Sequence, residues 1–339
     1  MSSSTIEKVT PRYALTNGEI VIDCKDFYLN PEHHYGVFVD GEPCTVTAAS
    51  RRRVVAVVPP DVEGTCTLHL ETGGVTGRSS EIVIATTLAD EMHIVANPAI
   101  DPKDNSIVMT RSGGRGQQIE HSMYRLELDG YLDEMPVEIM NPTGIAFSPA
   151  GELFVTNRAD GQVALIERGE EAIVYATGLG VATGLAFDED GVMYIGDRSG
   201  TVYRIPEPGV TEEFATIEPS VAAYHIAFGP DGRLYVTSPG LASHDFVYAI
   251  LRDGSVSKYF RGLGRPQGLA FDTDGNLYVA ACYQSKHGIV RIAPGGESAE
   301  HLVAANNAIG LCFTRQGEMI VATSDAIHSL PLGIQGTLL

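Results

Sequence analysis

The stretch PQGLAFDTDGNLYVAA occupies residues 266–281 and decides the fold, because relatives of it recur along the chain. The relatives are PTGIAFSPAGELFVTN at 142–157, ATGLAFDEDGVMYIGD at 182–197, AYHIAFGPDGRLYVTS at 223–238 and AIGLCFTRQGEMIVAT at 308–323. Their shared phenylalanines, Phe147, Phe187, Phe228, Phe271 and Phe313, lie 40, 41, 43 and 42 residues apart. A weaker copy, ANPAIDPKDNSIVMT, precedes them at 96–110. Such a constant period indicates a repeat architecture.

Each copy contains an apolar strand, a turn of the Asp-Gly type and a second strand with alternating character. A third strand follows the next loop, as in VALIE at 163–167, VYRI at 202–205, VYAI at 247–250 and IVRI at 289–292. With a further extended stretch, this gives four strands in about 42 residues, which is typical of one blade of a β-propeller. Six such units predict a closed ring. The last outer strand comes either from the terminal GIQGTLL or from the segment near 82–95.

Residues 1–88 do not follow this period. Their alternating stretches are EIVID at 19–23, YGVFVD at 35–40, CTVTAAS at 44–50, VVAVVPP at 54–60 and CTLHLET at 66–72. Short alternating strands separated by turn residues predict a small β-sandwich. The chain is therefore expected to be all-β, with a sandwich over 1–88 and a six-bladed propeller over 89–339.

The composition narrows the possible partners. The 339 residues include 43 acidic and 23 basic side chains, so the net charge is −20, and a nucleic-acid backbone would be repelled. There is no run of 18 apolar residues and no apolar leader at the start, so we expect a cytoplasmic protein without membrane contact. The five cysteines form no CxxC pair, which favours reduced, buried thiols over a disulfide framework or a thiolate zinc site.

Two resemblances follow from these patterns. The P-x-G-hydrophobic-A-F-x-x-D-G-x-L-Y-V phrase resembles the NHL repeat and the propellers of gluconolactonases and senescence-marker proteins. The phrases VTP at 9–11, GEIVI at 18–22, FVDGEPCTV at 38–46 and VVPP at 57–60 resemble the IPT/TIG immunoglobulin-like domain. The resemblances imply a six-bladed propeller preceded by an immunoglobulin-like sandwich.

In gluconolactonase-like families, acidic or amide side chains just before the repeat glycine hold a metal. This chain has Thr143, Thr183, Tyr224, Gln267 and Ile309 at those positions, with Ala96 and Asn97 in the first unit. Hard cations prefer carboxylates, and this set supplies none, so we expect no metal and no cofactor. A resemblance to peptide-amidating lyases, which use histidines for zinc, leaves a zinc site of His225, His244 and His287 as an alternative.

Aligned positions at one face form two rings. The first is polar and nearly uncharged and suits a neutral hydroxylated ligand, or simply lines a wet channel; it comprises Asn97, Thr143, Thr183, Tyr224, His225, Gln267 and Asn307. The second lies where the second strands end, at Thr110, Asn157, Asp197 and Ser238, and three of these are followed by Arg111, Arg158 and Arg198.

Guanidinium groups bind carboxylates in bidentate geometry, so the three arginines and Asn157 predict a clamp for a sugar acid, with Arg115 as a possible fourth contact. The alternative is ion pairing with Asp160 or Asp197. Arg125, Arg204 and Arg291 also repeat, but they lie within third strands and are expected to be structural.

The longer loops 238–245 and 282–288 bring His244, Tyr283, Lys286 and His287 to the same face, opposite the arginines. His225, His287 and Asp197 are the candidate acids and bases. The leading hypothesis is a gluconolactonase-like hydrolase acting on a sugar lactone, sugar acid or related carbohydrate. The alternatives are a non-enzymatic scaffold that binds carbohydrate or protein, and the histidine-zinc lyase. The oligomeric state stays open.

Overall fold

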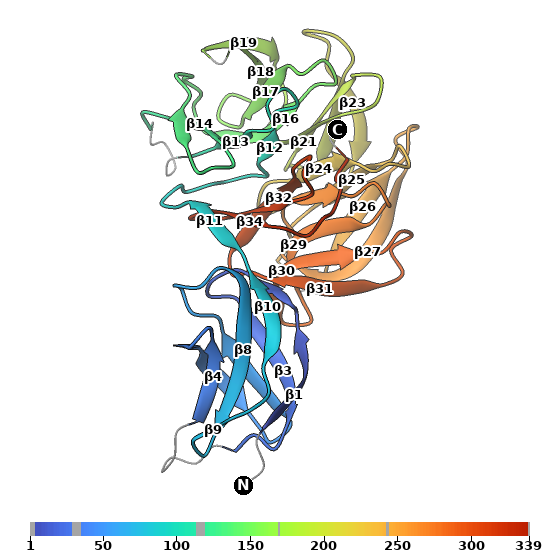
Figure 1. Ribbon diagram of the computed structural model, residues 1–339. Helices are drawn as coiled ribbons and strands as arrows, with labels where there is room; N and C mark the ends of the chain where they lie inside the picture. The colour runs from blue at the N-terminus through green and yellow to red at the C-terminus, as the bar shows by residue number, and fades with distance from the viewer. Residues whose placement is uncertain (1–3, 29–34, 113–118, 169, 242–243, 338–339) are drawn as a thin grey trace.

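The computed structural model describes residues 4–28, 35–112, 119–168, 170–241 and 244–337, and Figure 1 shows their arrangement. These residues form strands joined by turns, as the sequence predicts for an all-β chain. No helix in these ranges is long and apolar enough to cross a membrane. The five cysteines are free thiols, and Cys24, Cys44 and Cys66 are buried.

Within the described ranges, the strands after residue 85 group into six four-stranded antiparallel units. Four of these are separate sheets, whereas the fourth and fifth belong to one larger sheet, because the last strand of the fourth also pairs with the second strand of the fifth. The first unit comprises β12 (Ala99–Ile100), β13 (Ile107–Thr110), β14 (Met123–Leu126) and β15 (Leu132–Glu134), and the second comprises β16 (Pro142–Phe147), β17 (Leu153–Asn157), β18 (Gln162–Glu167) and β19 (Glu171–Ala176). The third comprises β20 (Ala182–Phe187), β21 (Met193–Asp197), β22 (Thr201–Ile205) and β23 (Glu212–Thr216), and the fourth comprises β24 (His225–Phe228), β25 (Leu234–Thr237), β26 (Asp245–Ile250) and β27 (Val256–Gly264). The fifth comprises β28 (Leu269–Phe271), β29 (Leu277–Tyr283), β30 (Lys286–Ile292) and β31 (Ala299–Ala304), and the sixth comprises β32 (Ala308–Phe313), β33 (Met319–Thr323) and β34 (Ile327–Leu330) with β11 (Thr86–Ala89).

The first strands of successive units contact one another in order, and β12 of the first unit contacts β32 of the last. The sixth unit takes its outer strand from β11, which pairs with β34. The segment before the repeats therefore completes this unit, and the terminal segment adds an isolated bridge between Gly336 and Asp272. The predicted junction between residues 88 and 89 falls inside β11.

The repeated phrase has a packing reason. Asp188 Oδ1 accepts hydrogen bonds from the backbone N–H of Asp190 (3.1 Å) and Val192 (2.8 Å), which fixes the turn between the first two strands. The hydroxyl of Tyr194 donates to Asp188 Oδ2 at 3.3 Å. The Tyr194 ring packs edge-on against Phe228 of the next unit at 5.1 Å. One phrase thus encodes both the turn and the aromatic contact between units.

The repeat glycine is required because neighbouring inner strands approach closely. A Cβ atom at Gly144 would lie 2.0 Å from the Thr183 carbonyl oxygen, and one at Gly184 would lie 2.8 Å from the Tyr224 carbonyl oxygen. Glycine relieves such approaches because it has no Cβ. In the fourth unit, His225 occupies this position.

The N-terminal part consists of two sheets around a shared core. One sheet has the order β1 (Thr5–Thr10), β3 (Glu19–Lys25), β7 (Arg53–Val57), β6 (Thr45–Ala49). The other contains β2 (Tyr13–Ala14), β10 (Ser80–Ile84), β8 (Gly64–Thr72), β4 (Tyr35–Val39) and β5 (Glu42–Pro43), with β9 (Val75–Thr76) beside β8. Ile22 and Val54 of the first sheet are buried in one cluster with Leu68 and Ile82 of the second.

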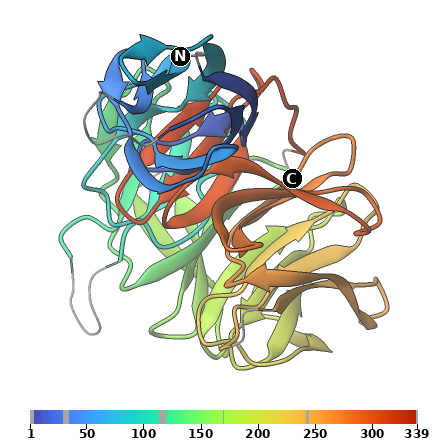
Figure 2. The same ribbon diagram turned by 90° about the horizontal axis from the view of Figure 1, so that it is seen from below.

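A continuous sheet joins the two parts, as Figures 1 and 2 show for the blue and orange strands. β2 runs parallel to both β10 and β31 and lies between them. The Leu15 N–H donates to the Ala304 carbonyl at 2.8 Å. Backbone hydrogen bonds therefore attach the N-terminal part to the outer edge of the fifth unit.

Candidate functional site

The three predicted arginines are held at one edge of the first three units. Arg111 Nη1 donates to the Tyr124 hydroxyl at 3.2 Å, and Arg158 Nη2 donates to Ser112 Oγ at 3.2 Å. Arg198 is exposed. Burial lowers the pKa of Arg158 from its ordinary value, and the positive charge of Arg198 lowers it further. The two guanidinium groups are therefore close enough to repel each other.

None of the three arginines forms an ion pair with an acidic side chain in the described part of the chain. The third-strand arginines behave in the opposite way, as predicted. Arg125 pairs with Asp101 at 2.9 Å, Arg204 pairs with Glu212 at 3.6 Å, and Arg291 pairs with Glu300. The ion pairing suggested for Arg111, Arg158 and Arg198 is thus wrong for the described residues.

The two acids proposed as their partners cap turns. Asp197 Oδ1 accepts from the backbone N–H of Val181 (2.9 Å) and Ser199 (3.0 Å), and Oδ2 accepts from the Ser199 hydroxyl. Asn157 Nδ2 donates to Asp160 at 2.8 Å. Asp197 is 3% exposed. Its carboxylate is occupied by these bonds, and the predicted role as a general acid or base has no geometric support.

The first predicted ring joins neighbouring units instead of presenting free polar groups. Thr110 Oγ1 donates to the Thr143 carbonyl (3.0 Å), Thr156 Oγ1 to the Thr183 carbonyl (2.9 Å) and Thr237 Oγ1 to the Gln267 carbonyl (2.6 Å). Each bond runs from a second strand to the inner strand of the next unit. The ring was predicted either to contact a ligand or to line a wet channel; the backbone carbonyls of Thr143, Thr183 and Gln267 hold the units together, and ligand contact by the ring stays a prediction.

The remaining hydroxyls of this ring are also engaged. Thr183 Oγ1 donates to the Gly196 carbonyl at 3.1 Å and accepts from the Tyr224 N–H at 3.0 Å. Thr143 is 1% exposed. The buried Tyr224 hydroxyl donates to the Glu218 carbonyl, and burial raises the pKa of Tyr224 to about 12. A ligand at this level would have to displace structural hydrogen bonds.

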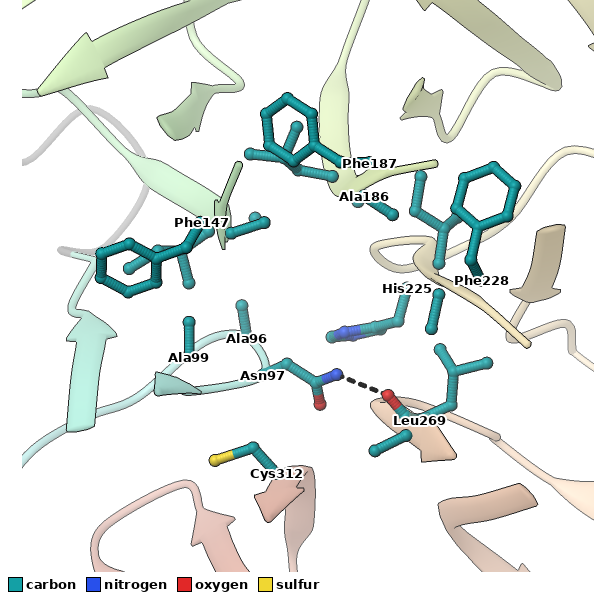
Figure 3. A pocket seen from close by; sticks show the side chains of 18 of the residues that line it. Ala96, Asn97, Ala99, Phe147, Ala186, Phe187, His225, Phe228, Leu269 and Cys312 are labelled. Atoms are coloured by element: carbon teal, nitrogen blue, oxygen red, sulfur yellow. Dashed lines mark hydrogen bonds between the residues drawn. The ribbon is translucent and has the colours of Figure 1, made fainter. Parts of the chain in front are cut away.

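Five members of the ring line a central cavity of about 200 Å³, namely Asn97, Thr143, Thr183, Tyr224 and His225, and Figure 3 labels Asn97 and His225 there. Asn97 Nδ2 donates to the Leu269 carbonyl at 2.9 Å, and its Oδ1 accepts from the Leu311 N–H at 3.0 Å. The side chain of the first unit thereby binds the fifth and sixth units. His225 is 5% exposed, and burial lowers its pKa to about 4, so the ring is neutral at pH 7.

The other predicted residues do not join this cavity. His287 is exposed, and its carbonyl accepts from His301 Nε2 at 2.9 Å. The Tyr283 ring packs near Phe260 at 6.1 Å, and His244 is exposed. Lys286 is half-buried and Asn307 exposed in their turns. Arg115 lies outside the described residues.

The candidate acids and bases therefore do not converge: His225 lines the cavity, whereas Asp197 and His287 do not. Nor do His225, His244 and His287 form the alternative zinc site. Across the described ranges, no three or more His, Cys, Asp or Glu side chains are placed to hold a metal ion.

Two residues that contact the predicted arginines could not be found from the sequence. Tyr124 and Ser112 orient Arg111 and Arg158, and Ser112 Oγ also lies 3.5 Å from Asn141 Oδ1. Ser112 directly follows Arg111, and that proximity is a weak signal. The sequence contains no signal for Tyr124, because its contact with Arg111 depends on how the third strand of the unit packs beside the second.

Neither a protein-family model nor a curated protein matches the sequence. Solved structures do match. An auxiliary nutrient-binding protein from Bacteroides ovatus is 13% identical, with 97% of this chain and 98% of that chain covered and a TM-score of 0.56. A putative gluconolactonase is 17% identical over 74% of this chain and 93% of its own, with a TM-score of 0.60.

An inactive H270A variant of virginiamycin B lyase from Staphylococcus aureus, solved with quinupristin, is 15% identical. It covers 92% of this chain and 98% of its own, with a TM-score of 0.53. At these identities the likeness concerns the fold alone. Together with the strand order, it shows that this chain is an all-β protein with a β-propeller.

Proposed function

We propose that the protein is a six-bladed β-propeller of the gluconolactonase-like group, preceded by an immunoglobulin-like sandwich of the IPT/TIG type. Six four-stranded units with contacting first strands support the blade number. Two sheets around a shared core support the sandwich. We further propose that the face carrying Arg111, Arg158 and Arg198 binds a small carboxylated carbohydrate.

The observation that carries this proposal is the absence of acidic partners for these three arginines among the described residues. The chain has a net charge of −20, so acidic side chains are abundant, and other arginines have found them. Keeping Arg158 and Arg198 close together without a counter-ion costs free energy. A carboxylate ligand would relieve that repulsion and accept bidentate hydrogen bonds.

Binding is supported better than turnover. The sequence favoured a gluconolactonase-like enzyme, but Asp197 caps a turn and His287 lies away from His225. Neighbours that match over nearly the whole chain include auxiliary nutrient-binding proteins, which agrees with a binding role. A lactonase stays the second candidate because His225 places a neutral imidazole in the central cavity and a putative gluconolactonase shares the propeller.

Isothermal titration calorimetry with glucuronate, galacturonate and glucose tests the proposal. We expect the two uronates to bind and glucose to bind at least tenfold more weakly. The double variant Arg158→Ala/Arg198→Ala should lose uronate binding while keeping its melting temperature. Arg204→Ala/Arg291→Ala removes the same number of charges from third strands and is the matched control.

Equal binding of the uronates by the arginine double variant and the wild type would refute the clamp. Equal binding of glucose and glucuronate by the wild type would refute the carboxylate preference. Incubation with glucono-1,5-lactone, followed by NMR detection of gluconate above the uncatalysed rate, separates the lactonase from the binding protein.

A further inference from the structure

The first and fourth units lack the repeat glycine and have Asn97 and His225 in its register, and the Asn97 amide binds backbone groups of the fifth and sixth units. Gly144, Gly184, Gly268 and Gly310 occupy this register elsewhere, and a Cβ there would contact the next strand. His225 stands in the same register, pairs with Thr237 and is 5% exposed. A large polar side chain at a position built for glycine needs a reason other than packing.

The His225 side chain is 5% exposed and makes no hydrogen bond to a described residue, but its ring nitrogens are not fully enclosed, so they are open to the cavity. Buried polar groups in proteins are almost always paired. Figure 3 shows the ring pointing into the central cavity beside Asn97. Asn97 does not pair with the His225 imidazole, because both ends of the Asn97 amide are already hydrogen-bonded to backbone groups.

The cavity is kept open by small side chains at one repeated position. The residue before the repeat phenylalanine, or before Ile100 in the first unit, lines the cavity in every unit; the set is Ala99, Ala146, Ala186, Ala227, Ala270 and Cys312. Five of the six, all but Ala186, are partly exposed although they lie on innermost strands. The repeated alanine of the A-F pair thus leaves room in the channel instead of filling it.

The cavity runs along the inner strands, from Thr143 and Thr183 near the ends that the arginines follow to the turns between the first and second strands. Its lining includes Ser148, Pro149 and Asp188, which lie in turns between first and second strands, and Thr337. Arg111, Arg158 and Arg198 follow the opposite ends of the second strands and are not in the lining. A strand of five residues separates the two ends by roughly 16 Å. The three arginines are therefore not part of the cavity wall, and its turn end lies a strand length away from them.

We propose that the central channel is a second binding site, which takes a compact, neutral and mostly apolar molecule whose single hydroxyl group hydrogen-bonds to His225. A neutral imidazole offers one N–H donor and one nitrogen acceptor, and a hydroxyl group can satisfy either. The wall around it contains the repeated alanines and the Cys312 thiol, which suit an apolar body. Its Thr183 and Tyr224 hydroxyls already hydrogen-bond to backbone carbonyls.

A charged ligand does not fit this site. Asp188, Glu189 and Asp190 lie together in one of the turns at the far end, and only Glu189 among them pairs with a described arginine, Arg252, so the turn still disfavours an anion. The Asp188 carboxylate itself is occupied by two backbone N–H groups and the Tyr194 hydroxyl. A cation in the channel would lose its hydration water to alanine side chains, and the Asp188 carboxylate is not free to replace that water, so binding a cation would cost free energy.

Phenol, toluene and benzoate are the test probes, because all three contain one benzene ring. Phenol carries a hydroxyl group, toluene lacks one, and benzoate carries a negative charge. Binding is followed by the shift in melting temperature and by the imidazole ¹⁵N signals of histidine-labelled protein. For the wild type we expect phenol to bind at least tenfold more tightly than toluene, and benzoate not to bind. Phenol should move the His225 signal, which is assigned by its loss in His225→Gly.

Variants make the test specific. His225→Gly restores the repeat residue, so it should fold normally and bind phenol no better than toluene. Ala146→Leu fills the channel from another unit and should abolish binding of both probes. Arg158→Ala/Arg198→Ala should bind phenol like the wild type, so that failure of the arginine site and failure of this site are distinguishable. Equal affinities of the wild type for phenol and toluene, or undiminished phenol binding by His225→Gly, would overturn the proposal.

Discussion

Arg158 Nη2 donates a 3.2 Å hydrogen bond to Ser112 Oγ, which connects the guanidinium of the second unit to the turn of the first. Arg158 is half-buried and has no acidic partner among the described residues, so this neutral hydroxyl fixes its position without neutralising it. The bond holds the Arg158 guanidinium beside the first unit, and the charge of Arg198 lowers the pKa of Arg158.

Removing this hydroxyl tests the positioning directly. Ser112→Ala should weaken glucuronate binding by about threefold to tenfold, because a single hydrogen bond to a charged group contributes about 1 kcal/mol at a partly exposed site. Calorimetry measures the change, and Ser257→Ala, which removes a hydroxyl bonded to the Ala249 carbonyl, is the control. An unaltered affinity in Ser112→Ala would show that Arg158 needs no such support.

Ionic strength should separate the two proposed sites. Uronate binding at exposed guanidinium groups should weaken about tenfold between 50 mM and 500 mM NaCl, because salt shortens the Debye length below about 5 Å. Phenol binding at His225 should stay constant or tighten slightly, since the ligand is neutral. Titrations of one protein preparation at both salt concentrations provide the comparison, and parallel salt responses would contradict the assignment of the sites.

The repeat glycine should tolerate no side chain where the next strand approaches. Gly144→Ala places a Cβ 2.0 Å from the Thr183 carbonyl oxygen and should lower the free energy of unfolding by about 3 kcal/mol. His225→Ala changes the same register in another unit and should cost less than about 1 kcal/mol, because a Cβ is already accommodated there. Urea denaturation of both variants measures the difference, and similar losses would refute this account.

Asn97 should be needed to hold the ring of units together. Its amide bonds the fifth and sixth units, at Leu269 and Leu311, from a position before the first strand of the first unit. Asn97→Ala removes both bonds and should lower the free energy of unfolding by about 2 kcal/mol. Thermal unfolding measures the loss, and hydrogen exchange should be faster at the Leu311 N–H than at amides of β21. A variant as stable as the wild type would show that strand contacts alone close the ring.

Two buried histidines should make the fold sensitive to acid. Burial lowers the pKa values of His225 and His328 from 6.5 to about 4. Between pH 6.5 and 4 the unfolded chain binds protons that the folded chain does not, so stability falls as the pH falls through this range. Each histidine contributes up to about 3 kcal/mol to this loss. In urea denaturation from pH 7 to 4.5, His225→Gly should lose less stability than the wild type.

Much of the fold could be predicted from the sequence because the relevant interactions are local and repeated. The Asp188 turn and the Tyr194–Phe228 contact recur with the phrase, so a constant period identifies units of the same strand order. The third-strand arginines were recognised for the same reason, since their partners lie one strand away, as in Arg204 and Glu212.

The roles of the site residues were harder to predict, because contacts between units determine which hydrogen bonds each side chain makes. Aligning the sequence placed Thr143, Thr183 and Gln267 in one ring, but could not show that hydroxyls of neighbouring strands bind their carbonyls. It placed Asp197 beside Arg198, yet the Asp197 carboxylate is taken by the Val181 and Ser199 N–H groups. Competition for hydrogen-bond donors is decided by distance in space, which spacing along the chain does not encode.

The sequence by itself determined the repeat, the all-β class and the register that brings Arg111, Arg158 and Arg198 to equivalent positions, because turns and alternation are properties of short segments. Only the tertiary structure decided that these arginines lack ion pairs with described residues, that β11 completes the sixth unit, and that His225 faces a cavity. These outcomes depend on which unit lies beside which, and a closed arrangement brings together residues as distant as Asn97 and Leu311.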